Sequence, residues 1–292
     1  MSYHQLKSVE DTALDAANAK LSAVTSGYYT DKYIEYFVPD RRRQLPPMNL
    51  GYYVRILSMY DAVVKFHEIH GDNMQVVILG CGYDTLFWRL RDEGINFTNW
   101  FDLDMKYIVD KKGSVILGAA FQPLTNYHLL QCDLSNFDQF QNVLTTNGFQ
   151  DIPTVFIDEC TLIYVDPSAV DKIINFAAHL KSSGFISYGM VRPDDNFGKM
   201  MVKNFSAIGA PLKGINAYPT INSHKERFER GGYSKVKSVD LNKVMRDILL
   251  PEERIRVARL EIQDDPEELE FMLMHYVLAL AGTDDEFLSI LK

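Results

Sequence analysis

A short apolar run in the first third of the chain ends in a glycine turn that could hold a ligand. Val76-Val77-Ile78-Leu79 leads directly into Gly80-Cys81-Gly82, where the glycines allow the backbone to approach a bound group closely. Acidic residues follow the next apolar runs, and their carboxylates can accept hydrogen bonds from ribose hydroxyls or an adenine amine. These positions are Asp102 and Asp104, Cys132-Asp133-Leu134, and Asp158-Glu159-Cys160. The pattern indicates a nucleotide-like binding site.

The spacing of the turn discriminates between two kinds of nucleotide ligand. A dinucleotide site has a third glycine for close helix packing around the pyrophosphate, and Thr85 occupies that position here. An S-adenosylmethionine site has no pyrophosphate and does not require this glycine. Asp104 lies 24 residues after Gly80, a spacing that suits a ribose ligand at the end of a second strand. Because structural turns also carry two glycines, the prediction of S-adenosylmethionine depends on the acids that follow.

Alternating strands and helices must position these residues. The runs that predict strands are residues 76–79, 97–103, 127–131, 154–157 and 185–190, with helices at 85–92 and 167–180. This alternation is typical of an α/β protein whose mostly parallel sheet carries helices on both faces. In such a sheet ligands bind beyond the carboxyl ends of the strands, where the glycine turn and the acids lie. We therefore predict the Rossmann-like fold of S-adenosylmethionine-dependent methyltransferases.

The two ends of the chain have less regular patterns. Helical spacing predicts helices at residues 11–24 and 56–69, joined by a loop that includes 39–47, and a further loop at 111–126. Later helices are predicted at 197–205, at 227–233 and from 266, and residues 276–280 fit either a strand or more helix. We predict a single domain, 1–292, with a helical cap at 1–72, a cofactor-binding core at 73–192 and a C-terminal elaboration at 193–292.

Composition excludes several classes of partner. The formal charge of −9 argues against nucleic acid, which requires clustered Lys and Arg. No apolar run approaches the ~20 residues that span a bilayer, and the first residues do not resemble a signal peptide. Three sparse cysteines, Cys81, Cys132 and Cys160, are typical of free thiols in a reducing compartment. We expect a monomer in the cytoplasm or nucleus without a metal, since His67 and His70 lack a third ligand nearby.

An ordered set of short blocks runs from about residue 11 to 281. The blocks are Ser26-Gly27-Tyr28 with Asp31 and Tyr33-Ile34, Gly51-Tyr52-Tyr53-Val54-Arg55, Leu79 to Thr85 running to Phe87-Trp88-Arg89-Leu90, Phe101-Asp102-Leu103-Asp104, Asp133-Leu134, Glu159-Cys160-Thr161-Leu162-Ile163-Tyr164, Arg192 to Met200, and His275-Tyr276. In this order they resemble the leucine carboxyl methyltransferase family. Its best-known members methylate the C-terminal leucine of the protein phosphatase 2A catalytic subunit.

The resemblance implies which residues hold S-adenosylmethionine. The implied contacts are Lys20 and Arg55 with the carboxylate of the methionine part, Gly80 and Gly82 with the cofactor backbone, Asp104 with the ribose hydroxyls, Asp133 and Leu134 with the adenine, and Glu159 with the amino group. Taken alone, Lys20 on an early helix would be a solvated surface charge. The neighbouring acids Asp102 and Asp158 stay open as alternatives to Asp104 and Glu159.

The resemblance also implies the acceptor, the α-carboxylate of a C-terminal leucine on the phosphatase 2A catalytic subunit. A terminal carboxylate, with a pKa of about 3.5, is already ionised at neutral pH and needs no general base. The reaction instead needs positioning and a cation in a dry pocket, which the resemblance assigns to Arg55 and Tyr164. The chain departs from the family at Tyr188-Gly189, where members carry Tyr-Glu.

Two other kinds of function remain open at this stage. One is a methyltransferase of the same family that acts on another carboxylate or on a tRNA base, although the tRNA-acting relatives carry an added repeat domain for which 292 residues leave no room. The other is a non-catalytic regulator that binds the phosphatase or the cofactor without turnover.

Overall fold

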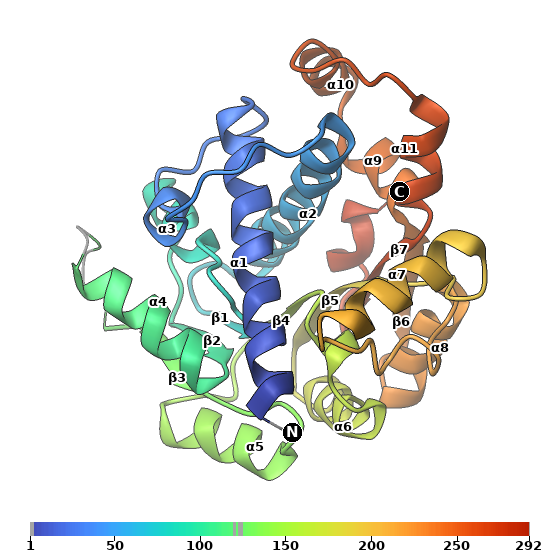
Figure 1. Ribbon diagram of the computed structural model, residues 1–292. Helices are drawn as coiled ribbons and strands as arrows, with labels where there is room; N and C mark the ends of the chain where they lie inside the picture. The colour runs from blue at the N-terminus through green and yellow to red at the C-terminus, as the bar shows by residue number, and fades with distance from the viewer. Residues whose placement is uncertain (1–2, 119–120, 122–124, 292) are drawn as a thin grey trace.

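The computed structural model describes residues 3–118, 121 and 125–291, and its centre is a seven-stranded sheet in the order β3-β2-β1-β4-β5-β7-β6 (Figure 1). The strands are β1 (Gln75–Leu79), β2 (Asn99–Asp104), β3 (Tyr127–Gln131), β4 (Thr154–Glu159), β5 (Ser183–Met190), β6 (Lys235–Asp240) and β7 (Tyr276–Gly282). Strands β1 to β5 pair with one another in parallel, and β7 runs antiparallel between β5 and β6. The ambiguous run near residue 276 is thus a strand.

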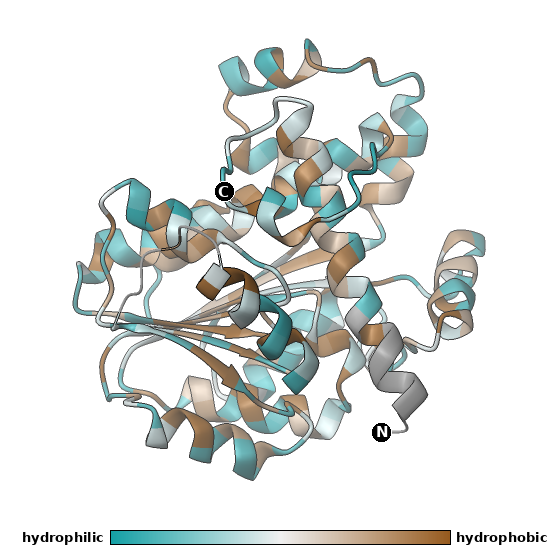
Figure 2. Ribbon diagram, turned by 60° about the vertical axis from the view of Figure 1, so that its left-hand side comes forward, coloured by the Kyte–Doolittle hydropathy of each residue, from teal (hydrophilic) through white to brown (hydrophobic). Residues whose placement is uncertain are grey.

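The inner strands are buried on both faces because helices cover the sheet on each side. Every residue of β1 and β5 is buried, whereas the edge strands β3 and β6 are only partly covered. This explains why the inner strands are continuous apolar runs in the sequence. Figure 2 shows these strands in brown between helices that alternate brown and teal. The predicted fold class, a mostly parallel sheet with helices on both faces, is confirmed.

Alternate residues of the strands belong to two separate hydrophobic cores. On one face Val76 and Ile78 pack with residues of α2 (Pro46–His70) and α3 (Leu86–Asp92). On the other face Val77 and Leu79 pack with α5 (Phe137–Thr146), α6 (Pro167–Ala178) and α8 (Ile221–Gly231). The loop predicted at 111–126 is wrong in its first part, because α4 (Lys106–Gly118) continues to residue 118.

Two long helices from the start of the chain lie beside the sheet, the first over its carboxyl edge and the second along one face. They are α1 (Tyr3–Thr25) and α2, which pack against each other and are drawn in blue in Figure 1. The prediction that Pro46 and Pro47 lie in a loop is wrong, since they form the first turn of α2. Proline is tolerated there because the first N–H groups of a helix have no intrahelical partner.

The C-terminal third adds helices around the second half of the sheet. These are α7 (Asn196–Ala207), α8, α9 (Leu241–Ile248), α10 (Pro251–Ala258) and α11 (Pro266–Leu273). The helix predicted to start at residue 227 begins six residues earlier, after Thr220, whose side chain accepts a hydrogen bond from the Ser223 N–H. This N-cap signal was available in the sequence. Within the described residues, no helix combines the length and apolarity needed to cross a bilayer.

Candidate functional site

The glycine turn lies where the strand order reverses, between β1 and β4. The chain moves outward from β1 to β2 and β3, then returns to place β4 on the other side of β1. Loops after β1 and β4 therefore separate in opposite directions and leave a crevice, which is where ligands bind in open α/β sheets. Two segments at the carboxyl ends of these strands face each other there: Gly80 after β1, and Glu159 to Thr161 at the end of β4.

The turn itself requires glycine at residue 80. Gly80 has a φ of +76°, and a Cβ built there would lie 2.1 Å from Cγ2 of Thr161. The Thr161 hydroxyl donates to the Gly80 carbonyl at 3.1 Å, so the first loop is fastened directly to the loop after β4. Cys160, the residue before Thr161, also adopts a left-handed conformation with a φ of +64°. Neither Thr161 nor Cys160 was predicted to have this positioning role.

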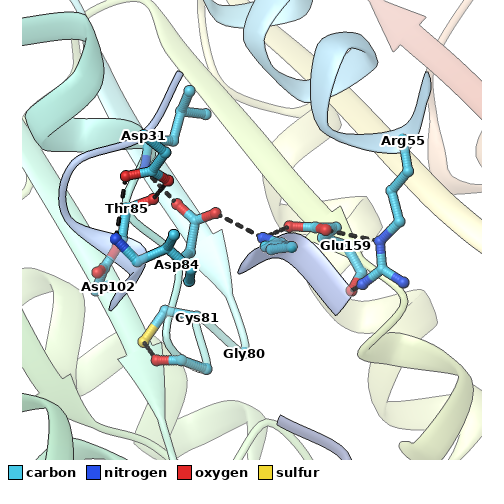
Figure 3. Close-up of polar contacts among 12 residues, drawn as sticks. Asp31, Arg55, Gly80, Cys81, Asp84, Thr85, Asp102 and Glu159 are labelled. Atoms are coloured by element: carbon cyan, nitrogen blue, oxygen red, sulfur yellow. Dashed lines mark hydrogen bonds and ion pairs between the residues drawn. The ribbon is translucent and has the colours of Figure 1, made fainter. Parts of the chain in front are cut away.

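Thr85, which stands where a dinucleotide site has its third glycine, is buried and has a different function. Its hydroxyl donates to the Asp31 carboxylate at 2.5 Å. Asp31 in turn accepts the backbone N–H groups of Tyr33 and Ile34. Thr85 thus attaches the segment between the two long helices to the start of α3 (Figure 3). A glycine at this position would lack the hydroxyl that makes this contact.

A cavity of about 320 Å³ opens at this edge of the sheet, beneath α1. Its walls include every residue that the sequence assigned to the site: Lys20, Arg55, Gly80, Gly82, Asp104, Asp133, Leu134, Glu159 and Tyr164. The size is at the lower end of the range for small-molecule sites. The structure therefore brings the predicted site residues together, and their individual roles toward a ligand stay predictions.

One wall of the cavity is a chain of buried charges. Arg55 Nε donates to Glu159 Oε1 at 2.6 Å, and Lys20 Nζ donates to Glu159 Oε2 at 2.8 Å and to Asp84 Oδ2 at 3.0 Å (Figure 3). The Lys20 side chain is only 9% exposed, so the expectation of a solvated lysine is wrong. Burial by itself lowers the pKa of Lys20, but the Glu159 and Asp84 carboxylates outweigh it and raise that pKa above its ordinary value.

Aromatic rings fix the Arg55 guanidinium. The guanidinium carbon lies 5.0 Å from the centre of the Tyr52 ring and 4.9 Å from that of Tyr188. Arg55 Nη2 also donates to the Glu159 backbone carbonyl at 3.1 Å. Contacts with two ring faces favour arginine over lysine, because the planar guanidinium stacks as well as pairs. The roles of Tyr188 and Asp84 were not predicted from the sequence, although both residues stand within or beside the blocks of the resemblance.

Burial distinguishes the two acids of each neighbouring pair, while their roles toward a ligand stay predictions. Asp102 is 2% exposed and accepts hydrogen bonds from Lys112, Trp100 and Tyr127, which makes it a structural acid. Asp104 instead lines the cavity. Its carboxylate accepts the N–H groups of Gly82 and Met105, both at 2.7 Å, while burial raises its pKa to about 6.

The two acids at the end of β4 also differ in burial and in their partners. Asp158 is buried and accepts the backbone N–H groups of Thr161 and Leu162 and the Ser187 hydroxyl. It therefore holds the strained turn at Cys160 in place. Glu159, the residue that the resemblance selected, is the one that faces the cavity.

The far end of the cavity is apolar. Tyr164, in the short 3-10 helix η2 (Leu162–Tyr164), lies 6.2 Å from Phe205 between ring centres. Met190, Phe205 and Ile208 complete this end. An acceptor that enters here meets hydrocarbon and one phenol rather than charge.

The departure from the family at Gly189 lies on the other face of β5. A Cβ built at Gly189 would lie 3.1 Å from Cε1 of His224 and 3.6 Å from Cγ1 of Val277. Because neighbouring residues of a strand point to opposite faces, Tyr188 contacts Arg55 while Gly189 packs against α8. Gly189 is therefore not part of the cavity wall.

The three cysteines are buried, and none of them forms a disulfide. Burial raises the pKa of Cys132 and of Cys160 to about 12, so neither thiol is a ready nucleophile at neutral pH. His67 contacts Asp72, and His70 stacks on Phe66. Within residues 3–118, 121 and 125–291 no group of three or more His, Cys, Asp or Glu is arranged to hold a metal ion.

Comparison with known proteins identifies the family. The leucine carboxyl methyltransferase family model matches residues 9–178, which contain the glycine turn and the charged wall of the cavity. The chain belongs to this family. It is 32% identical to the leucine carboxyl methyltransferase 1 homolog of Arabidopsis thaliana, over 94% of this chain and 89% of that protein. It is 30% identical to the probable leucine carboxyl methyltransferase 1 of Caenorhabditis briggsae, over 94% and 91%.

A second kind of relative is much longer. The chain is 28% identical to the human tRNA wybutosine-synthesizing protein 4, over 95% of this chain but only 44% of that protein. Among solved structures, the fold resembles a DUF574-family protein of Streptomyces avermitilis (TM-score 0.57, 13% identity, 91% and 97% of the two chains). It also resembles a geranyl diphosphate methyltransferase (TM-score 0.51, 10% identity, 97% and 99%). At these identities the structures establish the fold alone, and the family establishes that the chain is a methyltransferase.

Proposed function

We propose that this methyltransferase transfers the methyl group of S-adenosylmethionine to the α-carboxylate of the C-terminal leucine of the protein phosphatase 2A catalytic subunit. The proposal rests on which hydrogen-bond donors of Arg55 are already used. Its Nε and Nη2 are used by Glu159, whereas Nη1 makes no hydrogen bond with a described residue although Arg55 lines the cavity. A buried guanidinium with unused donors is suited to bind a carboxylate.

The residues present fit S-adenosylmethionine. Gly80 and Gly82 leave the backbone of the first loop open, and Asp104 offers acceptor oxygens for ribose hydroxyls. Leu134 supplies an apolar wall for adenine. Glu159 can accept hydrogen bonds from an amino group, and Lys20 keeps one N–H beyond those given to its two carboxylates. When bound, this cofactor supplies an electrophilic methyl group on a sulfonium.

The work left to the chain is to position the acceptor and exclude water. Because the acceptor carboxylate is ionised at neutral pH, no side chain has to remove a proton. Arg55 orients that carboxylate. Because Glu159 already offsets part of the positive charge of Arg55, the acceptor carboxylate is held without being neutralised. Tyr164 donates from its phenol, since burial raises its pKa well above the ordinary value and keeps it protonated. The buried Met190 and the partly buried Phe205 add apolar surface that suits a leucine side chain.

Two observations favour this acceptor over those of the rival functions. The relatives of matching length are leucine carboxyl methyltransferases, whereas the tRNA wybutosine-synthesizing proteins are more than twice as long as the part that this chain matches. A net charge of −9 also disfavours RNA. A non-catalytic regulator would not need unused donors on a buried arginine beside the cofactor loop.

The test uses S-adenosylmethionine with a labelled methyl group and two forms of the phosphatase catalytic subunit, intact and without its last leucine. We expect base-labile label on the intact form alone. Label that persists after the truncation would overturn the C-terminal assignment. Tight cofactor binding without any label would favour the regulator.

A further inference from the structure

A lysine-bearing groove lies on the outer side of α7, the helix whose inner side closes the cavity. Residues Phe205 and Ile208, at the end of this helix, line the cavity. The groove on the other side is lined by Pro193, Asp194, Lys199, Val202, Lys203 and Ala207, among others. One helix thus separates the apolar end of the site from a polar surface groove. Figure 1 shows α7 at the front of the molecule, next to the amino-terminal part of α1.

The two lysines of this groove are exposed and have no partners among the described residues. Neither Lys199 nor Lys203 makes a side-chain hydrogen bond or ion pair there. Asp194 is the acid of the groove, while Asp195 is used by the Gly198 N–H, by His275 and by Arg192. The groove therefore carries two cations against one anion, on a chain whose overall charge is −9. Such a local reversal of sign attracts acidic groups.

The spacing of the lysines matches an extended peptide. Residues four apart on a helix lie about 6 Å apart along its axis. In an extended chain, side chains on the same side are two residues apart, which is about 6.6 Å. Alternate acidic side chains of an extended segment can therefore meet Lys199 and Lys203 together. A chain end in the cavity reaches this groove by crossing α7, whose width of about 10 Å corresponds to about three extended residues.

We propose that the α7 groove binds an acidic segment of the acceptor protein that begins about three residues before its carboxyl terminus. The inference rests on the proposed function, because the terminal residue must occupy the cavity for its preceding residues to cross α7. The groove supplies affinity and orientation for the tail, while the chemistry stays with Arg55 and Tyr164. The acceptor would then be recognised by acidic residues upstream of the leucine as well as by the leucine itself.

Charge reversal tests the groove in turnover. The variant K199E/K203E is compared with K172E, which reverses the charge of an exposed, unpaired lysine on α6 that lines neither the cavity nor the groove. We expect the double variant to raise KM for the phosphatase catalytic subunit about tenfold, with the effect on KM rather than kcat, and K172E to change KM less than twofold. Added salt should reduce the difference. An unchanged KM, or an equal rise in K172E, would refute the groove.

A binding experiment separates this inference from the proposed function. Two fluorescent eight-residue peptides end in leucine, one with aspartates at the fourth and sixth positions from the end and one with asparagines there. With S-adenosylhomocysteine present, the aspartate peptide should bind wild-type protein about tenfold more tightly, and K199E/K203E should abolish the preference. Equal binding of the two peptides to wild-type protein contradicts the groove even where methyl ester forms. A preference without methyl transfer supports the groove and counts against the proposed function.

Discussion

Two buried ion clusters lie on either side of the glycine turn, and they differ in whether they line the cavity. Under the turn, Asp102 accepts from Lys112 at 2.7 Å, from Trp100 at 2.7 Å and from Tyr127 at 2.6 Å, and the Lys112 side chain is fully buried. On the cavity side, Arg55 and Lys20 share Glu159 and retain donors that no described residue takes.

The difference separates structural charge from charge available to a ligand. A buried pair that does not line the cavity holds strands and helices in register, here β2, β3 and α4. A charged cluster that lines a cavity can offer its remaining donors to a ligand. We therefore expect mutations in the first cluster to reduce stability, and mutations in the second to reduce binding and turnover.

The largest expected effect is on folding, from Lys112→Met. The change leaves the Asp102 carboxylate without its buried cation, which typically costs about 3–5 kcal/mol of unfolding free energy. Denaturant unfolding measures the loss. The double variant Lys112→Met/Asp102→Leu is the control and should recover part of it, because no buried charge is left alone. A loss below about 1 kcal/mol would show that the pair does not stabilise the fold.

The corresponding change in the cavity cluster is Arg55→Gln. We expect kcat/KM for methyl transfer to fall by about 10²–10³-fold, as when one positioned charge or hydrogen-bond donor is removed from an active site. Unfolding free energy should change less than in Lys112→Met, because Glu159 keeps its contact with Lys20. Arg55→Lys serves as the matched variant and should restore little activity, since lysine cannot stack between two rings. Full activity of either variant would remove Arg55 from the site.

Two glycines with similar φ angles can be compared to test the contact at the glycine turn. Gly80 and Gly148 have φ values of +76° and +88°, but a Cβ at Gly148 meets nothing within 4 Å. Gly148→Ala should cost about 1–2 kcal/mol of unfolding free energy, from backbone strain alone. Gly80→Ala should cost clearly more and weaken cofactor binding, because Thr161 must move. Equal losses in thermal unfolding would mean that the Gly80–Thr161 contact can relax freely.

The smallest expected effect is a pH dependence of cofactor binding through Asp104. Its pKa in the ligand-free protein is raised to about 6, and only the ionised carboxylate accepts from both ribose hydroxyls. The Kd of S-adenosylmethionine should thus be constant above pH 7 and rise as pH falls through 6, toward tenfold per pH unit. Calorimetry from pH 5 to 8 measures this slope.

The variant Asp104→Asn is the control for that slope. It should bind the cofactor more weakly at pH 8 and lose the added dependence below pH 6. Other groups that titrate in this pH range, such as Asp61 with a pKa raised to about 7, are present in both proteins, so their effects cancel in the comparison. A slope that persists in Asp104→Asn would assign the titration to another residue.

The sequence by itself determined the fold class, the five parallel strands of the core and the positions of the glycine turn and the acids beside it. Continuous apolar runs identify strands buried on both faces, and the residues that follow them must gather at one edge of a parallel sheet. Local signals were less informative at helix starts. The first turn of α2 was missed because Pro46 and Pro47 favour a loop, and the early turns of α8 and most of α4 were missed as well.

Only the tertiary structure decided which of two neighbouring acids lines the cavity. Asp102 and Asp104 lie on the same strand, and so do Asp158 and Glu159, so residue type and spacing cannot rank them. Their roles depend on partners that come from distant parts of the chain, such as Lys112 beneath the turn and Lys20 on α1. Lys20 itself looks like any solvated lysine in the sequence, and it becomes part of the site because α1 packs over the carboxyl edge of the sheet.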